Sequence, residues 1–214
     1  MRRNEVVHGG AFTDPKQLFL SAISGLEDFQ KSNTLPEERS NAAVQSSTST
    51  WLPPPGNMVK INWDAAINQK MSCVSLGILA RDKQGVFLAA CGVKQKMVAD
   101  STMAEALAAL YAVIFAKELG VSNVIFEGDA LTVMKAVNSE ESCESNYGHL
   151  VDDVKRFRSD LAISSFVHVG RGANFPAYVL AKEACNHVID KYWWHSIPSC
   201  IGDIIRKEEL SPFS

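Results

Sequence analysis

The order of apolar and polar positions along the chain predicts three neighbouring strands, followed by strands that alternate with helices. In VKINWDAAI, Val59, Ile61 and Trp63 alternate with Lys60 and Asn62, as in a strand with one apolar face. Four more strands are expected, in CVSLGILARD, GVFLAACGVK, NVIFEGD and SSFVHV. The first two of these four are joined by DKQG, whose glycine suits a tight turn.

Helical spacing is strongest in STMAEALAALYAVIFAKELG, where Leu107, Leu110 and Ile114 share one face and Gly120 is expected to end the helix. Three further helices are predicted, in ALTVMKAVN, GHLVDDVKRFRSDL and NFPAYVLAKEACNHVI, the last with Pro176 in its first turn. The resulting order, β-β-β-α-β-α-α-β-α, predicts an α/β fold in which helices flank a mixed five-stranded sheet.

The first 50 residues differ in composition from the rest of the chain. Residues 1–14 show no periodic pattern, whereas 15–30 carry apolar residues at helical spacing, which predicts a short amphipathic helix. A segment rich in Ser, Thr and Pro follows and is typical of a flexible linker. We therefore expect an N-terminal extension over residues 1–50 and one folded domain over residues 51–210.

The 214-residue chain has a formal net charge of −3 and a pI of about 6.0. This charge argues against strong non-specific binding of nucleic acid by the whole chain, but it allows a locally basic face. The five cysteines form no C-x-x-C pair, which favours a reducing compartment over disulfides or a zinc site. Because neither a signal peptide nor an apolar run of about 20 residues is found, we expect an intracellular protein in the nucleus or cytoplasm, neither secreted nor membrane-bound. We also expect a monomer.

Three acidic residues lie where the predicted fold would gather ligands, and each has a structural explanation as well. Asp64 interrupts an apolar strand, where a carboxylate is costly to bury unless it is hydrogen-bonded or binds a cation; it could also start a turn. Asp129 follows the strand NVIFEGD, at the end where α/β sheets bind ligands, and could cap the next helix. Glu105 lies early in the long helix, where TMAE matches a capping box.

Taken together, the three acids could meet at one edge of the sheet. Carboxylates that cluster raise one another's pKa unless cations neutralise them. Mg²⁺ and Mn²⁺ take oxygen ligands, and paired ions activate water and stabilise the leaving oxygen in phosphodiester cleavage. A divalent metal site is one interpretation of the three acids, and three separate structural roles are the other.

The chain resembles the type-1 ribonuclease H (RNase H) family, in the version found in plant proteins related to non-LTR retroelement reverse transcriptases. The resemblance covers about residues 51–210 and rests on five motifs in the right order: WLPPPGNMVKINWDAA, GILARDKQG, AEALAAL, FEGDAL and HVGRGAN. It implies a Mg²⁺- or Mn²⁺-dependent endonuclease that hydrolyses the RNA strand of RNA–DNA hybrids. Asp64, Glu105 and Asp129 match the family's carboxylates, so they would be catalytic residues and ligands of two metal ions. Arg171 and Asn174 are expected to contact the substrate.

One position departs from the family pattern. Active members carry a fourth metal-binding aspartate in the last helix, in a segment of the form AN-x-x-AD-x-LAK, whereas this chain reads ANFPAYVLAK and has Tyr178 there. A neutral phenol is a poor Mg²⁺ ligand, so the second ion is expected to bind weakly and cleavage to be reduced. Glu183 does not substitute, because five residues further along a helix it points about 140° away.

Two other functional hypotheses compete with the nuclease. A domesticated, inactive domain that binds nucleic acid or a protein partner is favoured by Tyr178 and by the acidic pI. An unrelated α/β domain whose acids only cap elements is the third hypothesis. The chain shows no aromatic-studded basic groove of the kind typical of single-strand binders. The basic residues that could follow a nucleic-acid backbone are Lys94, Lys96, Arg156, Arg158 and Arg171.

Overall fold

Three antiparallel strands form the centre of the computed structural model, as the alternating pattern predicts. β1 (Val59–Asn68) pairs with β2 (Cys73–Arg81), and β2 pairs with β3 (Phe87–Gln95). β1 continues past Asp64 as far as Asn68, so Asp64 neither ends the strand nor starts a turn. The structural explanation of Asp64 as a turn residue is therefore wrong.

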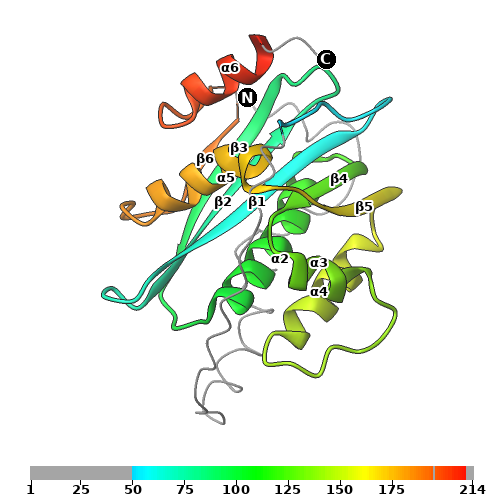
Figure 1. Cartoon of the computed structure of the whole chain (residues 1–214), viewed down its shortest axis with the longest axis vertical. Coiled ribbons are helices and arrows are strands. Elements are labelled where there is room, and N and C mark those ends of the chain that lie inside the picture. The colour runs from blue at the N-terminus through cyan, green and yellow to red at the C-terminus, as the bar shows by residue number, and fades with distance from the viewer. Residues whose placement is uncertain (1–49, 195, 211–214) are drawn as a thin grey trace. The chain divides into compact units, whose positions relative to one another are not determined.

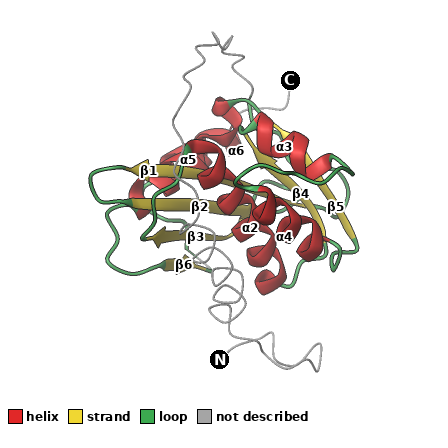
Figure 2. Cartoon of the chain, turned by 90° about the horizontal axis from the view of Figure 1, so that it is seen from below, coloured by secondary structure: helices red, strands yellow, loops and turns green. Residues whose placement is uncertain are grey.

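Three more strands complete the sheet: β4 (Asn123–Gly128), β5 (Ile163–His168) and β6 (Lys191–Trp193). β4 pairs with β1 and β5 pairs with β4, both in parallel, while β6 pairs antiparallel with β3. The order across the sheet is β5-β4-β1-β2-β3-β6, and Figure 2 shows β1, β2, β3 and β6 side by side. The sheet is mixed, as predicted, and the short β6 makes it six-stranded instead of five-stranded.

Five helices are described: α2 (Ser101–Leu119), α3 (Leu131–Asn138), α4 (Gly148–Arg158), α5 (Arg171–Ala184) and α6 (Gly202–Leu210). The helices α2, α3 and α4 gather together (Figure 1), and α2 packs on both β1 and α4. The helix α5 lies on β1, β2 and β3, and α6 joins it in a core cluster that includes Leu79, Leu180 and Ile205.

The last part of the chain differs from the prediction in detail. α5 begins at Arg171, so Arg171 belongs to the helix and not to the loop before it. Pro176 is therefore the sixth helical residue and lies beyond the first turn; because it lacks an N–H, it cannot donate to the carbonyl of Gly172. Neither β6 nor α6 was predicted.

The two faces of β1 differ in chemistry. Ile61 and Trp63 are fully buried on one face. Asn62 and Asp64 point to the opposite face, where α5 lies, because alternate residues of a strand point to opposite sides. On β2, Gly77 pairs with Asp64, and a Cβ at this glycine would lie 2.3 Å from the α5 backbone. The missing side chain at Gly77 lets α5 approach the sheet closely beside Asp64.

The structure describes residues 50–194 and 196–210, which all belong to one compact unit, Ser46–Ser214. The helix predicted over residues 15–30 and the linker after it lie outside the described residues. Of the helices in the described ranges, none has the length and apolar character that crossing a membrane requires.

Candidate carboxylate site

Asp64 lies where β1 extends beyond its parallel neighbour, two residues past the last β1–β4 pair, Asn62 with Glu127. Asp64 is only 3% exposed and accepts a hydrogen bond from Asn174 Nδ2 at 3.1 Å. Burial and, to a smaller extent, the negative charge of Asp129 raise the pKa of Asp64 from 3.8 to about 7. Asp64 is therefore a carboxyl group whose ionised form is poorly solvated in this fold.

Glu105 reaches Asp64 from α2. Its Oε1 accepts a hydrogen bond from the backbone N–H of Ala65 at 3.4 Å, and its Oε2 is buried with no hydrogen-bond partner among the described residues. Burial, followed by the charges of the two aspartates, raises the pKa of Glu105 well above its ordinary value. The capping-box explanation is wrong, because α2 is capped by Asp100, whose carboxylate accepts from the Met103 N–H at 2.8 Å.

Asp129 directly follows β4. The next helix, α3, has Ala130 as its N-cap residue and no side-chain cap, so the capping explanation is wrong for Asp129 as well. The Oδ2 atom of Asp129 lies 3.4 Å from Arg171 Nε, and its carbonyl oxygen lies 3.1 Å from His168 Nε2. Asp129 thus lies at the carboxyl end of a parallel strand, with a basic side chain beside its carboxylate.

The structure brings the three acids close enough that their charges act on one another. As the side chains lie, however, the described part of the chain has no group of three or more His, Cys, Asp or Glu residues that could hold a metal ion. The donor chemistry nevertheless suits a hard divalent cation, because the ligands would be oxygen atoms that are desolvated and mutually repulsive, and Glu105 Oε2 lacks a partner. That the three carboxylates close on a common ion stays a prediction.

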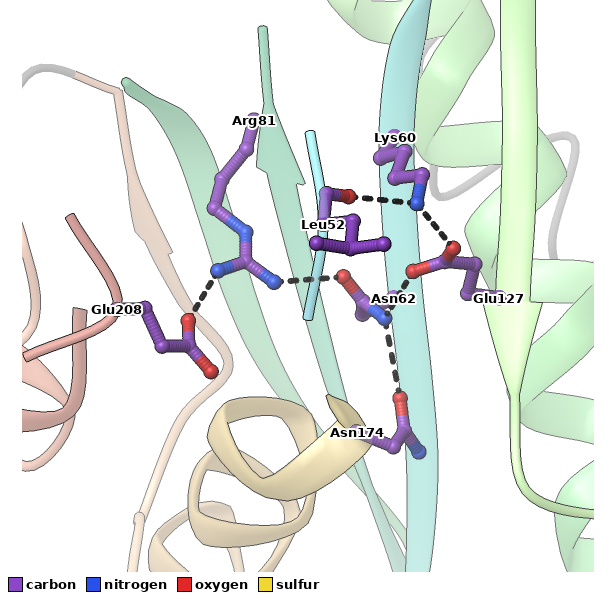
Figure 3. Close-up of polar contacts among 7 residues, drawn as sticks. All are labelled: Leu52, Lys60, Asn62, Arg81, Glu127, Asn174 and Glu208. Carbon is purple, nitrogen blue, oxygen red and sulfur yellow. Dashed lines mark hydrogen bonds and ion pairs between the residues drawn. The ribbon is translucent and has the colours of Figure 1, made fainter. Parts of the chain in front are cut away.

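A buried polar network joins Asn174 of α5 to Asn62 and to the charged residues beyond it (Figure 3), and Asn174 also contacts Asp64. Asn174 donates through Nδ2 to the carbonyl of Trp63 at 2.8 Å as well as to Asp64, and its Oδ1 accepts from Asn62 Nδ2 at 3.4 Å. Asn174 is 0% exposed, and its amide holds Asp64; its contact with substrate stays a prediction.

Beyond Asn62 the network consists of paired charges. Asn62 accepts from Arg81 Nη2 at 3.0 Å and donates to Glu127 Oε2 at 3.1 Å. Arg81 forms an ion pair with Glu208 of α6, and Lys60 forms one with Glu127 at 2.5 Å. Each of these charges has a partner of opposite sign, which is the condition for burying it. The alternation in β1 marked Lys60 and Asn62 as polar, but it could not show that Asn62 is buried against α5 and Lys60 against Trp51 and Leu52.

Tyr178, at the position of the expected fourth carboxylate, lies one turn after Asn174 on α5 and is half-buried. Its ring stacks on that of Phe175, with centroids 5.9 Å apart. The charged groups of Arg171 and Lys182 each lie 5.6 Å from the Tyr178 ring centroid. From the sequence, His168 could be a strand-face residue or a functional one; the structure places it at the end of β5, beside the backbone carbonyl of Asp129.

A comparison with family models decides the relationship. Residues 62–184, more than half of the chain, match the model of the reverse transcriptase-like family. The chain belongs to this family. The match confirms the RNase H-like, reverse-transcriptase-related character that the sequence motifs predict.

Solved structures agree with this assignment. RNase H1 from the archaeon Halobacterium salinarum is similar with 22% identity and a TM-score of 0.56, over 60% of this chain and 98% of that one. The N-terminal RNase H domain of a Mycobacterium tuberculosis protein is similar with 17% identity and a TM-score of 0.55, over 60% and 94%. A compost metagenome RNase H1 in complex with an RNA/DNA hybrid is similar with 18% identity and a TM-score of 0.51, over 58% and 94%. These similarities establish an RNase H fold. A search of curated protein sequences found no match.

Proposed function

We propose that this domain is an RNase H-type nuclease that hydrolyses the RNA strand of RNA–DNA hybrids with Mg²⁺ or Mn²⁺. The observation that carries the proposal is that Asp64, Glu105 and Asp129 lie near enough for their charges to act on one another and cap no helix. The RNase H fold supports it, and so does the RNA/DNA hybrid bound to one of the similar RNase H1 proteins.

In this proposal the three acids hold the divalent ions, which when bound activate water and stabilise the leaving oxygen. Asn174 orients Asp64 through its amide, and the Ala65 N–H orients Glu105. Arg171, whose side chain is 76% exposed, can leave Asp129 to contact a phosphate of the substrate. Because burial favours the protonated form of Asp64, ion binding competes with a proton there, and we expect activity to rise as the pH passes about 7.

A second candidate function is binding without cleavage. The observation that favours it is Tyr178, which places a phenol where the family pattern has a carboxylate. In that case the domain binds nucleic acid through the surface around the three acids but lacks the ligands that keep the second ion in place.

The experiment that separates the two functions is cleavage of a hybrid with a labelled RNA strand, in millimolar Mg²⁺ or Mn²⁺. We expect weak cleavage that is stronger with Mn²⁺ and that Asp64→Asn removes. The matched control is Asp152→Asn, an exposed aspartate on α4, which should cleave like the wild type. Cleavage that persists unchanged in Asp64→Asn would contradict the proposed role of the three acids.

A further inference from the structure

One face of α5 carries basic and aromatic side chains next to the carboxylate site. Arg171, Phe175, Tyr178 and Lys182 are spaced by four, three and four residues, which places them along one stripe of a helix. We call these four residues the α5 stripe. Arg171, Phe175 and Lys182 are exposed, and Tyr178 is half-buried.

The two rings of the stripe are held in place and flanked by positive charge. They stack with an interplanar angle of 23°. Both Arg171 and Lys182 lie within cation–π distance of Tyr178, and Phe175 nevertheless remains 42% exposed. The nearest acid along the helix, Glu183, follows Lys182 by one residue and so points about 100° away from it. The stripe therefore presents an open ring between two cations, with no carboxylate among its own residues.

This combination of groups matches the chemistry of a single strand of nucleic acid. Proteins that bind single strands stack bases on aromatic rings and meet the phosphates with basic side chains. A duplex keeps its base faces stacked internally, so it offers little to Phe175. A purely apolar protein partner would use the rings but would have no use for the two cations. The charges of the stripe complement a phosphate backbone, and its rings complement unpaired bases.

We infer that the α5 stripe binds a few unpaired nucleotides, with a base stacked on Phe175 and phosphates at Arg171 and Lys182. The stripe spans ~16 Å, enough for a few nucleotides. Its place beside the cleavage site rests on the proposed function: Arg171 lies 3.4 Å from Asp129, so a strand that leaves the three acids would continue along α5. The spacing along the helix separates these residues in the sequence, which is why no aromatic and basic surface was expected.

The test measures single-strand binding in the absence of divalent metal, by fluorescence anisotropy of labelled oligo-dT and oligo-U with the full chain. Phe175→Leu keeps an apolar side chain but loses the ring, so affinity should fall by about fivefold or more, the value of one base–aromatic stack. Phe175→Tyr keeps the ring and should stay within about twofold of the wild type. The matched control is Tyr192→Ala, an exposed aromatic residue on β6 outside the stripe, which should bind like the wild type.

In Lys182→Gln, the slope of the logarithm of affinity against the logarithm of salt concentration should become less steep by about 0.7, as expected for one lost phosphate contact. Unchanged affinity in Phe175→Leu, or an equal loss of affinity in Tyr192→Ala, would overturn the inference. Unchanged affinity in Phe175→Leu would assign the stripe to a protein partner or to solvent. Absence of hybrid cleavage would refute the proposed function alone, because this binding assay contains no metal.

Discussion

At the scale of single residues, Asp64 is the clearest case of a side chain whose ionised form the fold alone does not stabilise. A carboxylic acid whose pKa is raised by folding holds its proton more tightly in the folded state. Asp64 therefore stabilises the metal-free protein below its ordinary pKa of 3.8, and this contribution is lost as the pH rises through about 7. A divalent ion would restore it, because the ion favours the ionised carboxylate.

We predict that Asp64→Asn is more stable than the wild type without metal at about pH 8, by roughly 1 to 3 kcal/mol. The amide carries no charge to desolvate, and it keeps an oxygen that can accept from Asn174. The difference should vanish near pH 3, below the ordinary pKa of 3.8, where Asp64 is protonated in the folded state and mostly protonated in the unfolded state. Urea unfolding at both pH values, with EDTA, measures it. Asp152→Asn serves as the control and should change neither value, whereas equal stability of Asp64→Asn and wild type at the higher pH would contradict the raised pKa.

Tyr178 gives a second prediction at this scale, because a carboxylate at this position would favour cleavage but weaken single-strand binding. Tyr178→Asp would supply the missing carboxylate, so hybrid cleavage should increase by tenfold or more, about 1.4 kcal/mol of barrier. The same change removes a ring of the α5 stripe and adds a negative charge between two cations, so single-strand affinity should fall.

Cleavage and single-strand binding are measured on the same preparation of Tyr178→Asp. The double variant with Asp64→Asn should return cleavage to background, because the added carboxylate acts only together with the other three. If Tyr178→Asp folds and gains no cleavage with either metal, the fourth ligand does not limit the domain, and the binding function becomes the better account.

At the scale of elements, a chain of polar contacts connects α6 to the candidate site. Glu208 pairs with Arg81, Arg81 donates to Asn62, and Asn62 donates to Asn174, which holds Asp64. The Arg81 side chain is 1% exposed and that of Glu208 14%. A buried charge that loses its counter-ion keeps its desolvation cost.

We therefore predict that Glu208→Ala lowers the free energy of unfolding by about 2 to 4 kcal/mol, whereas Glu208→Gln, which keeps an acceptor for Arg81, costs less. Urea unfolding measures both. Glu183→Ala, an exposed glutamate on α5, is the control and should stay within about 0.5 kcal/mol of the wild type. A cost for Glu208→Ala no larger than that of the control would show that α6 does not depend on this ion pair.

The elements that the sequence predicted well are those whose pattern is local. The alternation of Ile61 and Trp63 with polar neighbours defines β1, and the apolar spacing of the long helix defines α2. β6 has three residues and exists only because β3, about 100 residues earlier in the chain, offers an open edge, so no local pattern could predict it. Similarly, only the position of α5 reveals that Asn174 holds Asp64.

At the scale of the whole molecule, few of the basic side chains expected to follow a nucleic-acid backbone remain available. Lys94 donates to the carbonyl of Cys185 at 2.8 Å, Arg156 pairs with Asp153 at 2.6 Å, and Arg158 donates to the carbonyl of Val137 at 3.4 Å. The net charge of −3 adds a weak general repulsion. Lys96 is exposed, and so are Arg171 and Lys182, the two that lie on the α5 stripe next to the candidate site, where we expect the phosphate contacts to concentrate.

We predict that the full chain binds RNA–DNA hybrid in EDTA with a micromolar or weaker Kd at physiological salt, the range of non-specific contacts. With about two or three phosphates neutralised, the logarithm of affinity should fall with the logarithm of salt concentration with a slope of about −2 to −3. Arg171→Gln should make that slope less steep by about one, while Arg156→Gln, whose partner Asp153 already holds its charge, should leave the slope unchanged. Anisotropy titrations at several salt concentrations measure these slopes. Nanomolar binding that survives high salt would contradict the prediction, because two or three phosphate contacts on an acidic chain cannot supply it.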